Sequence, residues 1–254
     1  MIPHFCYAIP TIIFLNLPML VFAVENKKII VIAAHPDDID FGCSGTIALW
    51  SGKNIVRYVV CTSGEKGLKN YKGSNLAKDI REKEQMTAAE AAGVKDVLFM
   101  REKDGELVNN FDFRQKLVKI IRAYKPDIIF CPDPAIQKYD NFYLYHPDHR
   151  AVAHAVFDSV YPAVGNHLFF PELLSEGCTP HQIATLYFFA TENPNIWMDI
   201  TDAIEIKIKA LAAHESQITN INELGTFIKE MAAKAGKKKG MKYAEAFRKL
   251  DVPP

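Results

Sequence analysis

The chain has 254 residues, of which 49% are hydrophobic and 24% are charged. This length and composition suit one α/β domain, or one domain with a small extension, and exclude a disordered chain. Thirty basic and thirty acidic residues cancel to a formal net charge of zero, so no overall electrostatic field attracts nucleic acid or anionic lipid. We therefore expect no nucleic-acid partner and a small or neutral substrate.

An apolar leader over residues 1–24 is the first feature in chain order. It is almost continuously apolar from residue 5 and ends in Val21-Phe22-Ala23, which suits a signal-peptide cleavage site. No Lys or Arg precedes the apolar run, and two prolines and an asparagine interrupt it, which disfavours a membrane-spanning helix. A signal peptide predicts export, to the periplasm or outside the cell, and an atypical leader predicts a cytoplasmic protein. Residues 25–254 are expected to form the enzyme-like domain.

After the leader, strand-like and helix-like segments alternate, which predicts a mostly parallel sheet with helices on both faces. The expected strands are 29–34, 56–61, 97–100, 128–131 and 183–190. The expected helices are 45–51, 76–92, 111–124, 147–164, 203–214 and 243–250. The fold class is therefore α/β, a Rossmann-like three-layer sandwich.

Two His-Pro-Asp clusters follow strands of this predicted sheet. His35-Pro36-Asp37-Asp38 comes directly after the first strand, and His146-Pro147-Asp148-His149 follows the fourth strand across a long loop. Ligands of open α/β sheets bind outside the carboxyl ends of the strands, where both clusters fall. One such cluster alone is more often a capped helix start. Two clusters in matching positions favour a metal site, because together they supply the three protein ligands that a catalytic zinc usually takes.

Further motifs lie along the chain in a characteristic order. They are Ala34-His35-Pro36-Asp37-Asp38 with Gly42-Cys43-Ser44-Gly45-Thr46, Thr62-Ser63-Gly64-Glu65, Ile80-Arg81-Glu82-Lys83-Glu84, Tyr143-Leu144-Tyr145-His146-Pro147-Asp148-His149-Arg150, Trp197-Met198-Asp199-Ile200-Thr201 and Lys209-Ala210-Leu211-Ala212-Ala213-His214-Glu215-Ser216-Gln217. Together they resemble the zinc-dependent N-acetylglucosaminyl deacetylases of the LmbE-like, or PIG-L, superfamily. The resemblance covers most of the chain and implies the LmbE-like fold.

The resemblance also implies a metal set and a base. One zinc ion per chain is expected on His35, Asp38 and His149, with water completing its shell. Asp37 matches the general base that takes a proton from metal-activated water. His146 matches a second catalytic histidine, which Asp148 would hold as an imidazolium that stabilises charge or protonates the leaving amine.

Three further residues match substrate-binding positions of the family. Arg81 would hold a sugar hydroxyl or a linked acidic group, although a surface salt bridge explains it equally well. Asp104 would lie near the sugar, although Asp-Gly is also an ordinary turn. Tyr143 would aim its phenol at the oxyanion, in competition with Tyr139 and Tyr145. His214 belongs to a motif that recurs near the pocket in the family, and core packing is the favoured interpretation for it.

The function implied is a hydrolase that removes the acetyl group from a small N-acetylglucosamine-containing molecule or glycoconjugate. One alternative is an amidase that cleaves a different amide of a thiol-conjugated or lipid-linked amino sugar. Another is a sugar-binding module without catalysis, which the complete set of ligand and base residues disfavours. The group attached to the sugar, the metal used in the cell and the oligomeric state, a homo-oligomer included, stay open at this point.

Overall fold

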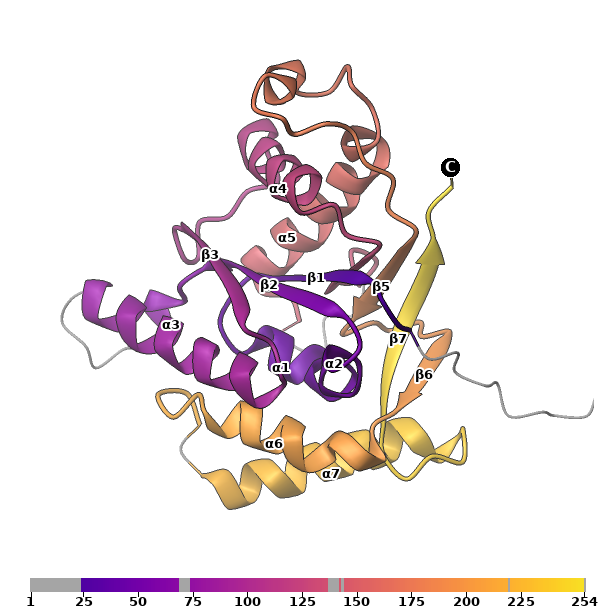
Figure 1. The fold of residues 1–254 in the computed structure, drawn as a ribbon. Coiled ribbons are helices and arrows are strands. Elements are labelled where there is room, and N and C mark those ends of the chain that lie inside the picture. Colours follow the sequence, from indigo (N-terminus) through magenta and orange to yellow (C-terminus); the bar gives the residue numbers. More distant parts are fainter. Residues whose placement is uncertain (1–23, 69–73, 137–141, 143, 219, 254) are drawn as a thin grey trace, which may run out of the picture.

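Apolar, β-branched segments form the centre of a twisted sheet in the computed structural model, which describes residues 24–68, 74–136, 142, 144–218 and 220–253. Seven strands are found among these residues (Figure 1). They are β1 (Lys28–Ala33), β2 (Ile55–Thr62), β3 (Asp96–Glu102), β4 (Ile128–Pro132), β5 (Thr185–Phe189), β6 (Ile196–Asp199) and β7 (Ala244–Asp251). Their order across the sheet is β3-β2-β1-β4-β5-β7-β6.

The sheet is mostly parallel, as the alternating pattern predicts. β1 pairs in parallel with β2 and β4, β2 with β3, and β4 with β5. β7 runs antiparallel to both of its neighbours, β5 and β6. The carboxyl ends of the five parallel strands therefore meet at one edge, to which both His-Pro-Asp clusters are attached.

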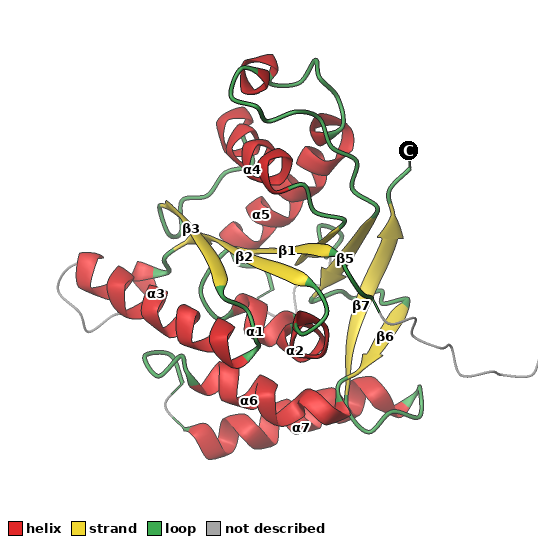
Figure 2. Ribbon diagram, in the orientation of Figure 1, coloured by secondary structure: helices red, strands yellow, loops and turns green. Residues whose placement is uncertain are grey.

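Helices cover both faces of the sheet (Figure 2). The α-helices among the described residues are α1 (Asp38–Gly42), α2 (Ser44–Ser51), α3 (Ser74–Ala91), α4 (Phe111–Tyr124), α5 (Pro147–Asp158), α6 (Ile204–Ala212) and α7 (Ile221–Lys237). A π-helical turn (Ser159–Val164) and short 3₁₀ turns (Glu65–Gly67, Pro171–Leu174 and Thr201–Ala203) complete the helical structure. Helices α4 and α5 lie on one face, α1 to α3 lie on the other, and α6 and α7 lie beneath α1 to α3 (Figure 1). The three-layer α/β prediction is thus confirmed, with α6 and α7 added outside one layer.

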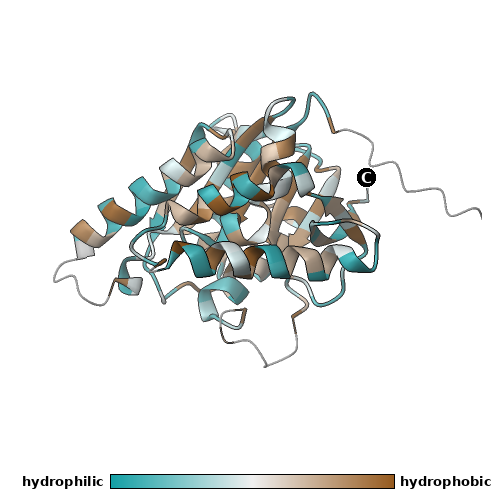
Figure 3. Cartoon of the chain, turned by 90° about the horizontal axis from the view of Figure 1, so that it is seen from below, coloured by the Kyte–Doolittle hydropathy of each residue, from teal (hydrophilic) through white to brown (hydrophobic). Residues whose placement is uncertain are grey.

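The core lies on both sides of the central strand β1. Its side chains Ile30 and Ile32 pack into the cluster beneath α4 and α5, and Ile29 and Val31 pack into the cluster beneath α1 and α2. Burial on both faces explains why this strand is a continuous apolar run and does not alternate. A third cluster joins α6 and α7. Viewed from below, the helices on this side show polar and apolar residues interleaved, as expected of amphipathic helices (Figure 3).

Two details of the sequence-based prediction were wrong. The segment 243–250, expected to be a helix, is strand β7, because pairing on both edges with β5 and β6 outweighs the helix propensity of its Ala, Glu and Lys residues. The helix expected over 147–164 ends at Asp158 and continues only as the π-helical turn. Helix α7 and strand β6 were not anticipated.

The predicted leader, residues 1–24, lies outside the described residues except for Val24. Within the described part of the chain, none of the helices combines the length and the apolar character needed to cross a bilayer.

Candidate metal centre and active site

The turn after β1 forms the first half of the site. The backbone N–H of His35 donates to Oδ2 of Asp38 at 2.8 Å, which folds the four-residue segment back on itself. Asp38 then begins the short helix α1, with Asp37 at its N-cap. Pro36 restricts the backbone between them, and Asp37 adopts φ 90° and ψ −30°, a conformation that L-residues rarely take. This strained turn holds the side chains of His35 and Asp38 on the same side.

The start of α5 forms the second half. Pro147 occupies the first turn, where its missing N–H costs no hydrogen bond, and the side chain of His146 caps the helix by accepting from the N–H of Asp148. This start places the next residue, His149, against the turn that follows β1. Nε2 of His149 lies 3.1 Å from Nδ1 of His35, although 114 residues separate them in sequence.

Four ligand-type atoms of three residues converge between the two halves. Oδ1 of Asp38 lies 3.0 Å from Nε2 of His149, and Oδ2 lies 3.5 Å from Nδ1 of His35. Tetrahedral zinc with bonds of about 2.0–2.1 Å keeps its ligand atoms roughly 3.3–3.4 Å apart. The observed separations of 3.0–3.5 Å, measured to one or the other carboxylate oxygen of Asp38, lie near that value. The structure therefore brings together the three predicted metal ligands, and their imidazole and carboxylate chemistry fits zinc.

Two other groupings near His35 have ligand-type atoms within 4.8 Å of one another: His35 with His146 and His149, and His35 with Asp104 and Asp148. Nδ1 of His146 is engaged with the N–H of Asp148, so Asp38 is the better third ligand. The carboxylates of Asp104 and Asp148 both lie at Nε2 of His35, the ring nitrogen that faces away from His149, and hold the ring in place.

The surroundings of His35 favour a cation. Burial lowers the pKa of His35, but the carboxylates of Asp104, Asp148 and Asp38 raise it, with a net result of about 12. Burial raises the pKa of Asp38, but the positive charge of His149 and hydrogen bonds from His149 and His35 hold this pKa well below its usual range. Positive charge between these side chains is therefore strongly stabilised, whether a proton or a metal ion supplies it.

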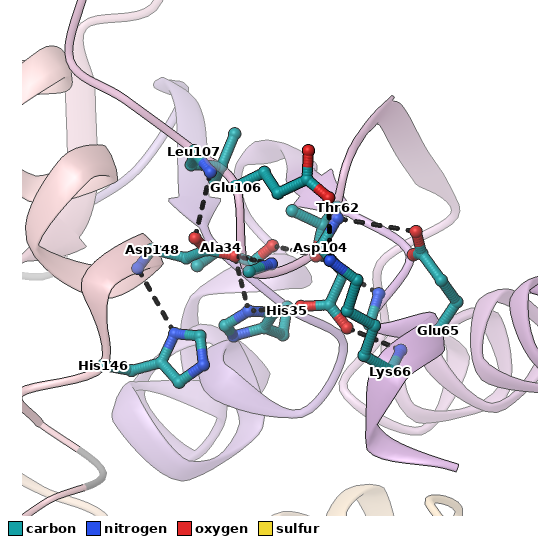
Figure 4. Close-up of polar contacts among 12 residues, drawn as sticks. Ala34, His35, Thr62, Glu65, Lys66, Asp104, Glu106, Leu107, His146 and Asp148 are labelled. Carbon is teal, nitrogen blue, oxygen red and sulfur yellow. Dashed lines mark hydrogen bonds and ion pairs between the residues drawn. The ribbon is translucent and has the colours of Figure 1, made fainter. Parts of the chain in front are cut away.

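Asp148 takes a different position from the one expected. Its carboxylate, which is fully buried, lies 3.2 Å from Nε2 of His35 and accepts the N–H groups of Gly105 and Leu107 at 2.6 and 3.1 Å (Figure 4). The prediction that it holds His146 as an imidazolium was wrong, because Asp148 meets His146 through its backbone N–H. Asp148 orients the ring of His35, a predicted metal ligand, as carboxylates commonly do behind zinc-bound histidines.

His146 stands beside the predicted metal ligands, and no carboxylate of the described residues forms a hydrogen bond or ion pair with its ring. Its ring centroid lies 4.7 Å from that of His35 and 5.3 Å from that of His149. Burial, together with the positive charge of His35 and His149, lowers its pKa. Since Nδ1 accepts a hydrogen bond, the proton of the neutral ring resides on Nε2. We therefore interpret His146 as a neutral donor through Nε2.

Asp37 lies beside the three predicted ligands, and its role as general base stays a prediction. Its Oδ2 accepts from Nη2 of Arg81 at 3.0 Å. Burial raises the pKa of Asp37 to about 6, although the neighbouring charge of Arg81 acts in the opposite direction. Its carboxylate is 19% exposed, so it reaches the surface of the site.

The predicted substrate-binding residues lie in three different situations. Arg81 is only 4% exposed, and its guanidinium holds the metal turn through the carbonyl of Pro36 and the carboxylate of Asp37. Asp104 is also buried, with Oδ1 at 3.2 Å from Nε2 of His35 and Oδ2 accepting from the N–H of Lys66. Tyr143 lies outside the described residues. Contact of these three residues with a sugar stays a prediction.

A buried polar chain that was not predicted from the sequence lies behind Asp37. Gln85, Asp40 and His214, all fully buried, are linked by hydrogen bonds to one another and to the backbone of Asp37. One signal was available for Gln85, which follows Arg81 by four residues and so lies on the same face of α3. His214, assigned to core packing, is buried as expected, but it forms an ion pair with Asp40.

Comparisons with known proteins agree with this geometry. The PIG-L family model, whose description is GlcNAc-PI de-N-acetylase, matches residues 30–160, which include both His-Asp clusters. A diacetylchitobiose deacetylase of Thermococcus kodakarensis is 34% identical over 228 residues, covering 88% of this chain and 83% of the relative. A probable N-acetyl-alpha-D-glucosaminyl L-malate deacetylase 2 of Bacillus anthracis is 26% identical, covering 79% and 86%. Among solved structures, N,N'-diacetylchitobiose deacetylase from Pyrococcus horikoshii matches with a TM-score of 0.81 and 32% identity, covering 88% and 84%.

Proposed function

The chain belongs to the PIG-L family of GlcNAc-PI de-N-acetylases, and on that premise we propose that it is a zinc-dependent N-deacetylase of small N-acetylglucosamine-containing molecules or glycoconjugates. The reaction consumes one water and one acetamide and yields acetate and a free amine. The observation that carries the proposal is the convergence of His35, Asp38 and His149 within 3.0–3.5 Å beside an uncoordinated Asp37.

One zinc ion per chain is part of the proposal. His35, Asp38 and His149 would hold it, leaving room for water in a tetrahedral shell. When bound, zinc lowers the pKa of a bound water and polarises an amide carbonyl as a Lewis acid.

The remaining steps belong to side chains of this protein. The carboxylate of Asp37, steadied by Arg81, accepts the proton of the attacking water and returns it to the nitrogen of the leaving amine as the C–N bond breaks. Nε2–H of His146 donates a hydrogen bond to the carbonyl oxygen as negative charge develops there. Neither role needs a charged His146, which agrees with the direction of its pKa.

The substrate class rests on the relatives. Those at 34% and 26% identity are named as deacetylases of N-acetylated amino sugars. A formal net charge of zero agrees with a substrate that needs no electrostatic steering. We therefore place the acetamido group of an N-acetylglucosamine unit at the metal and leave the attached group to experiment.

Acetate release across a panel of N-acetylated sugars tests the function. Zinc-reconstituted protein is incubated with N-acetylglucosamine, diacetylchitobiose and N-acetylglucosaminyl conjugates, each paired with its N-butyryl analogue. We expect stoichiometric acetate and free amine from at least one acetyl substrate, and one zinc per chain by elemental analysis. Release of butyrate in preference to acetate would instead favour the alternative amidase, and release of neither acid from zinc-loaded protein would refute the proposal.

A further inference from the structure

The backbone of Asp37 is held in a strained conformation by a specific contact. Its φ of 90° is rare for a residue with a side chain, and such a strained conformation persists only where the surrounding structure imposes it. The N–H of Asp37 donates to Oε1 of Gln85 at 3.0 Å, and Gln85 is fully buried in α3. On the other side of the turn, Arg81 of the same helix holds the carbonyl of Pro36 at 2.6 Å.

Gln85 is in turn fixed by two residues behind it. Its Nε2 donates to Oδ2 of Asp40 at 2.9 Å, and Nε2 of His214 lies 2.9 Å from the same oxygen. All three side chains are 0% exposed. His214 comes from the segment after α6, beyond residues 30–160, so a distant part of the chain reaches the metal turn from behind.

The chain of hydrogen bonds has only one consistent direction. The N–H of Asp37 can only donate, so the amide of Gln85 must turn its oxygen to Asp37 and its NH₂ to Asp40. The carboxylate of Asp40 accepts this bond and therefore requires a donor from Nε2 of His214. A change at His214 is thus transmitted to the amide orientation of Gln85 and from there to Asp37.

Packing alone does not account for this arrangement. Oδ1 of Asp40 and Nδ1 of His214 are buried and find no partner among the described residues. Partly satisfied polar groups in a core cost more than apolar side chains of the same size, so stability by itself would favour an apolar filling. The polar chain instead fixes the direction in which the backbone N–H of Asp37 points.

We propose that Gln85, oriented by Asp40 and His214, is a positioning residue that holds the backbone of Asp37 so that its carboxylate faces the metal site. The inference rests on the proposed role of Asp37 as general base. It predicts that disturbing Gln85 weakens turnover without removing metal, since Gln85 has no contact with His35, Asp38 or His149 among its hydrogen bonds.

The principal test is Gln85→Leu, which keeps the volume and removes both hydrogen bonds. We expect kcat to fall about 10-fold to 100-fold, KM to change less than about 3-fold and zinc to stay at one per chain. Hydrogen exchange of the Asp37 amide, followed by NMR in the metal-free protein, should accelerate at least 10-fold while amides of β1 keep their protection. A kcat within 2-fold of wild type, or unchanged exchange at Asp37, would overturn the proposal.

Rescue separates positioning from folding. His214→Leu should show the same kcat loss as Gln85→Leu, and His214→Gln should recover most of it, because a glutamine amide can still donate to Asp40. His181→Leu is the matched control, since it removes a histidine bond to the carbonyl of Pro126 far from the site. It should lower the thermal midpoint without changing kcat or Asp37 exchange. Equal kcat losses in all three leucine variants would reduce the role of Gln85 to stability and overturn the proposal.

The exchange measurement also keeps the two proposals apart. Should the wild-type protein release no acetate from any substrate, the proposed deacetylase function fails. The Asp37 amide then still reports whether Gln85 positions this turn.

Discussion

The carboxylate of Asp148 lies 3.2 Å from Nε2 of His35, at the ring nitrogen opposite the one that meets His149. A histidine that ligates metal through Nδ1 keeps its N–H on Nε2, and a buried carboxylate there fixes both the tautomer and the ring plane. Two backbone N–H groups, of Gly105 and Leu107, hold the carboxylate in turn. The loop after β3 therefore contributes to the metal site without supplying a ligand.

Asp148→Asn tests this arrangement. The substitution keeps the shape and removes the negative charge behind His35, so we expect zinc affinity to fall roughly 10-fold to 100-fold. Competition with a chelating dye measures the affinity directly. Asp158→Asn, at a half-buried aspartate at the other end of α5, is the control and should bind zinc as wild type does. Unaltered affinity in Asp148→Asn would mean that Asp104 alone suffices to hold the ring.

Asp37→Asn should abolish turnover and leave the metal in place. The amide cannot accept the proton of the attacking water, and loss of a general base typically costs about 10²-fold to 10⁴-fold in kcat. Asparagine also tolerates positive φ, so the strained turn survives the change. Steady-state acetate release and elemental analysis on the same sample check both halves of the expectation. Zinc-loaded Asp37→Asn with near wild-type kcat would remove Asp37 from the reaction.

His149→Ala should lose the metal. Two of the three convergent ligands remain, on the turn after β1, and two side chains seldom retain zinc against a chelator. Elemental analysis after dialysis against a mild chelator gives the occupancy. His154→Ala, an exposed histidine of the same helix, is the control and should keep full occupancy. Full zinc occupancy in His149→Ala would contradict the ligand assignment.

A buried ion pair between Lys207 and Glu245 joins α6 to β7 and caps α2. Nζ of Lys207 lies 2.6 Å from Oε1 of Glu245, and the Glu245 carboxylate accepts the N–H groups of Gly45 and Thr46. Removing one partner leaves a buried charge unpaired, so we expect Glu245→Leu to lower the free energy of unfolding by about 3–5 kcal/mol. Lys207→Met in the same background should recover part of the loss. Denaturant unfolding of the two single variants and the double variant measures the coupling, and simple additivity would argue against it.

The pair of His214 with Asp40 predicts a pH-dependent stability. Burial lowers the pKa of His214, but Asp40 and, more weakly, Asp37 raise it against Arg81, so it lies above the ordinary 6.5. A raised folded-state pKa stabilises the protein fully below the unfolded value and loses that contribution as the pH rises through the folded value. The stability advantage of wild type over His214→Gln should therefore shrink as the pH rises from 6 to 9. Urea unfolding of both proteins at the two pH values measures this difference, because the contributions of the other titrating groups cancel when the two proteins are compared. The same difference in unfolding free energy at pH 6 and pH 9 would exclude the linkage.

Local patterns in the sequence were sufficient for the parallel core and for the place of the predicted metal site. A strand buried on both faces must be continuously apolar, so residues 29–34 could be recognised without a structure. The predicted ligands His35, Asp38 and His149 occur in compact motifs after the carboxyl ends of strands, where open α/β sheets bind their ligands. Short-range spacing encodes these features, and short-range spacing can be read from one chain.

Only the tertiary structure decided which partner each charged side chain meets. Asp148 follows His146 by two residues, yet its carboxylate contacts His35, which is 113 residues away. Segment 243–250 became a strand because two neighbours offered their edges, and His214 became a support of Asp37 because α6 packs beneath α1. Such contacts depend on the packing of elements distant in sequence. A buried polar group without a hydrogen-bond partner is costly, so each buried group pairs with whichever partner the packing brings next to it. No local pattern in a single sequence records that choice.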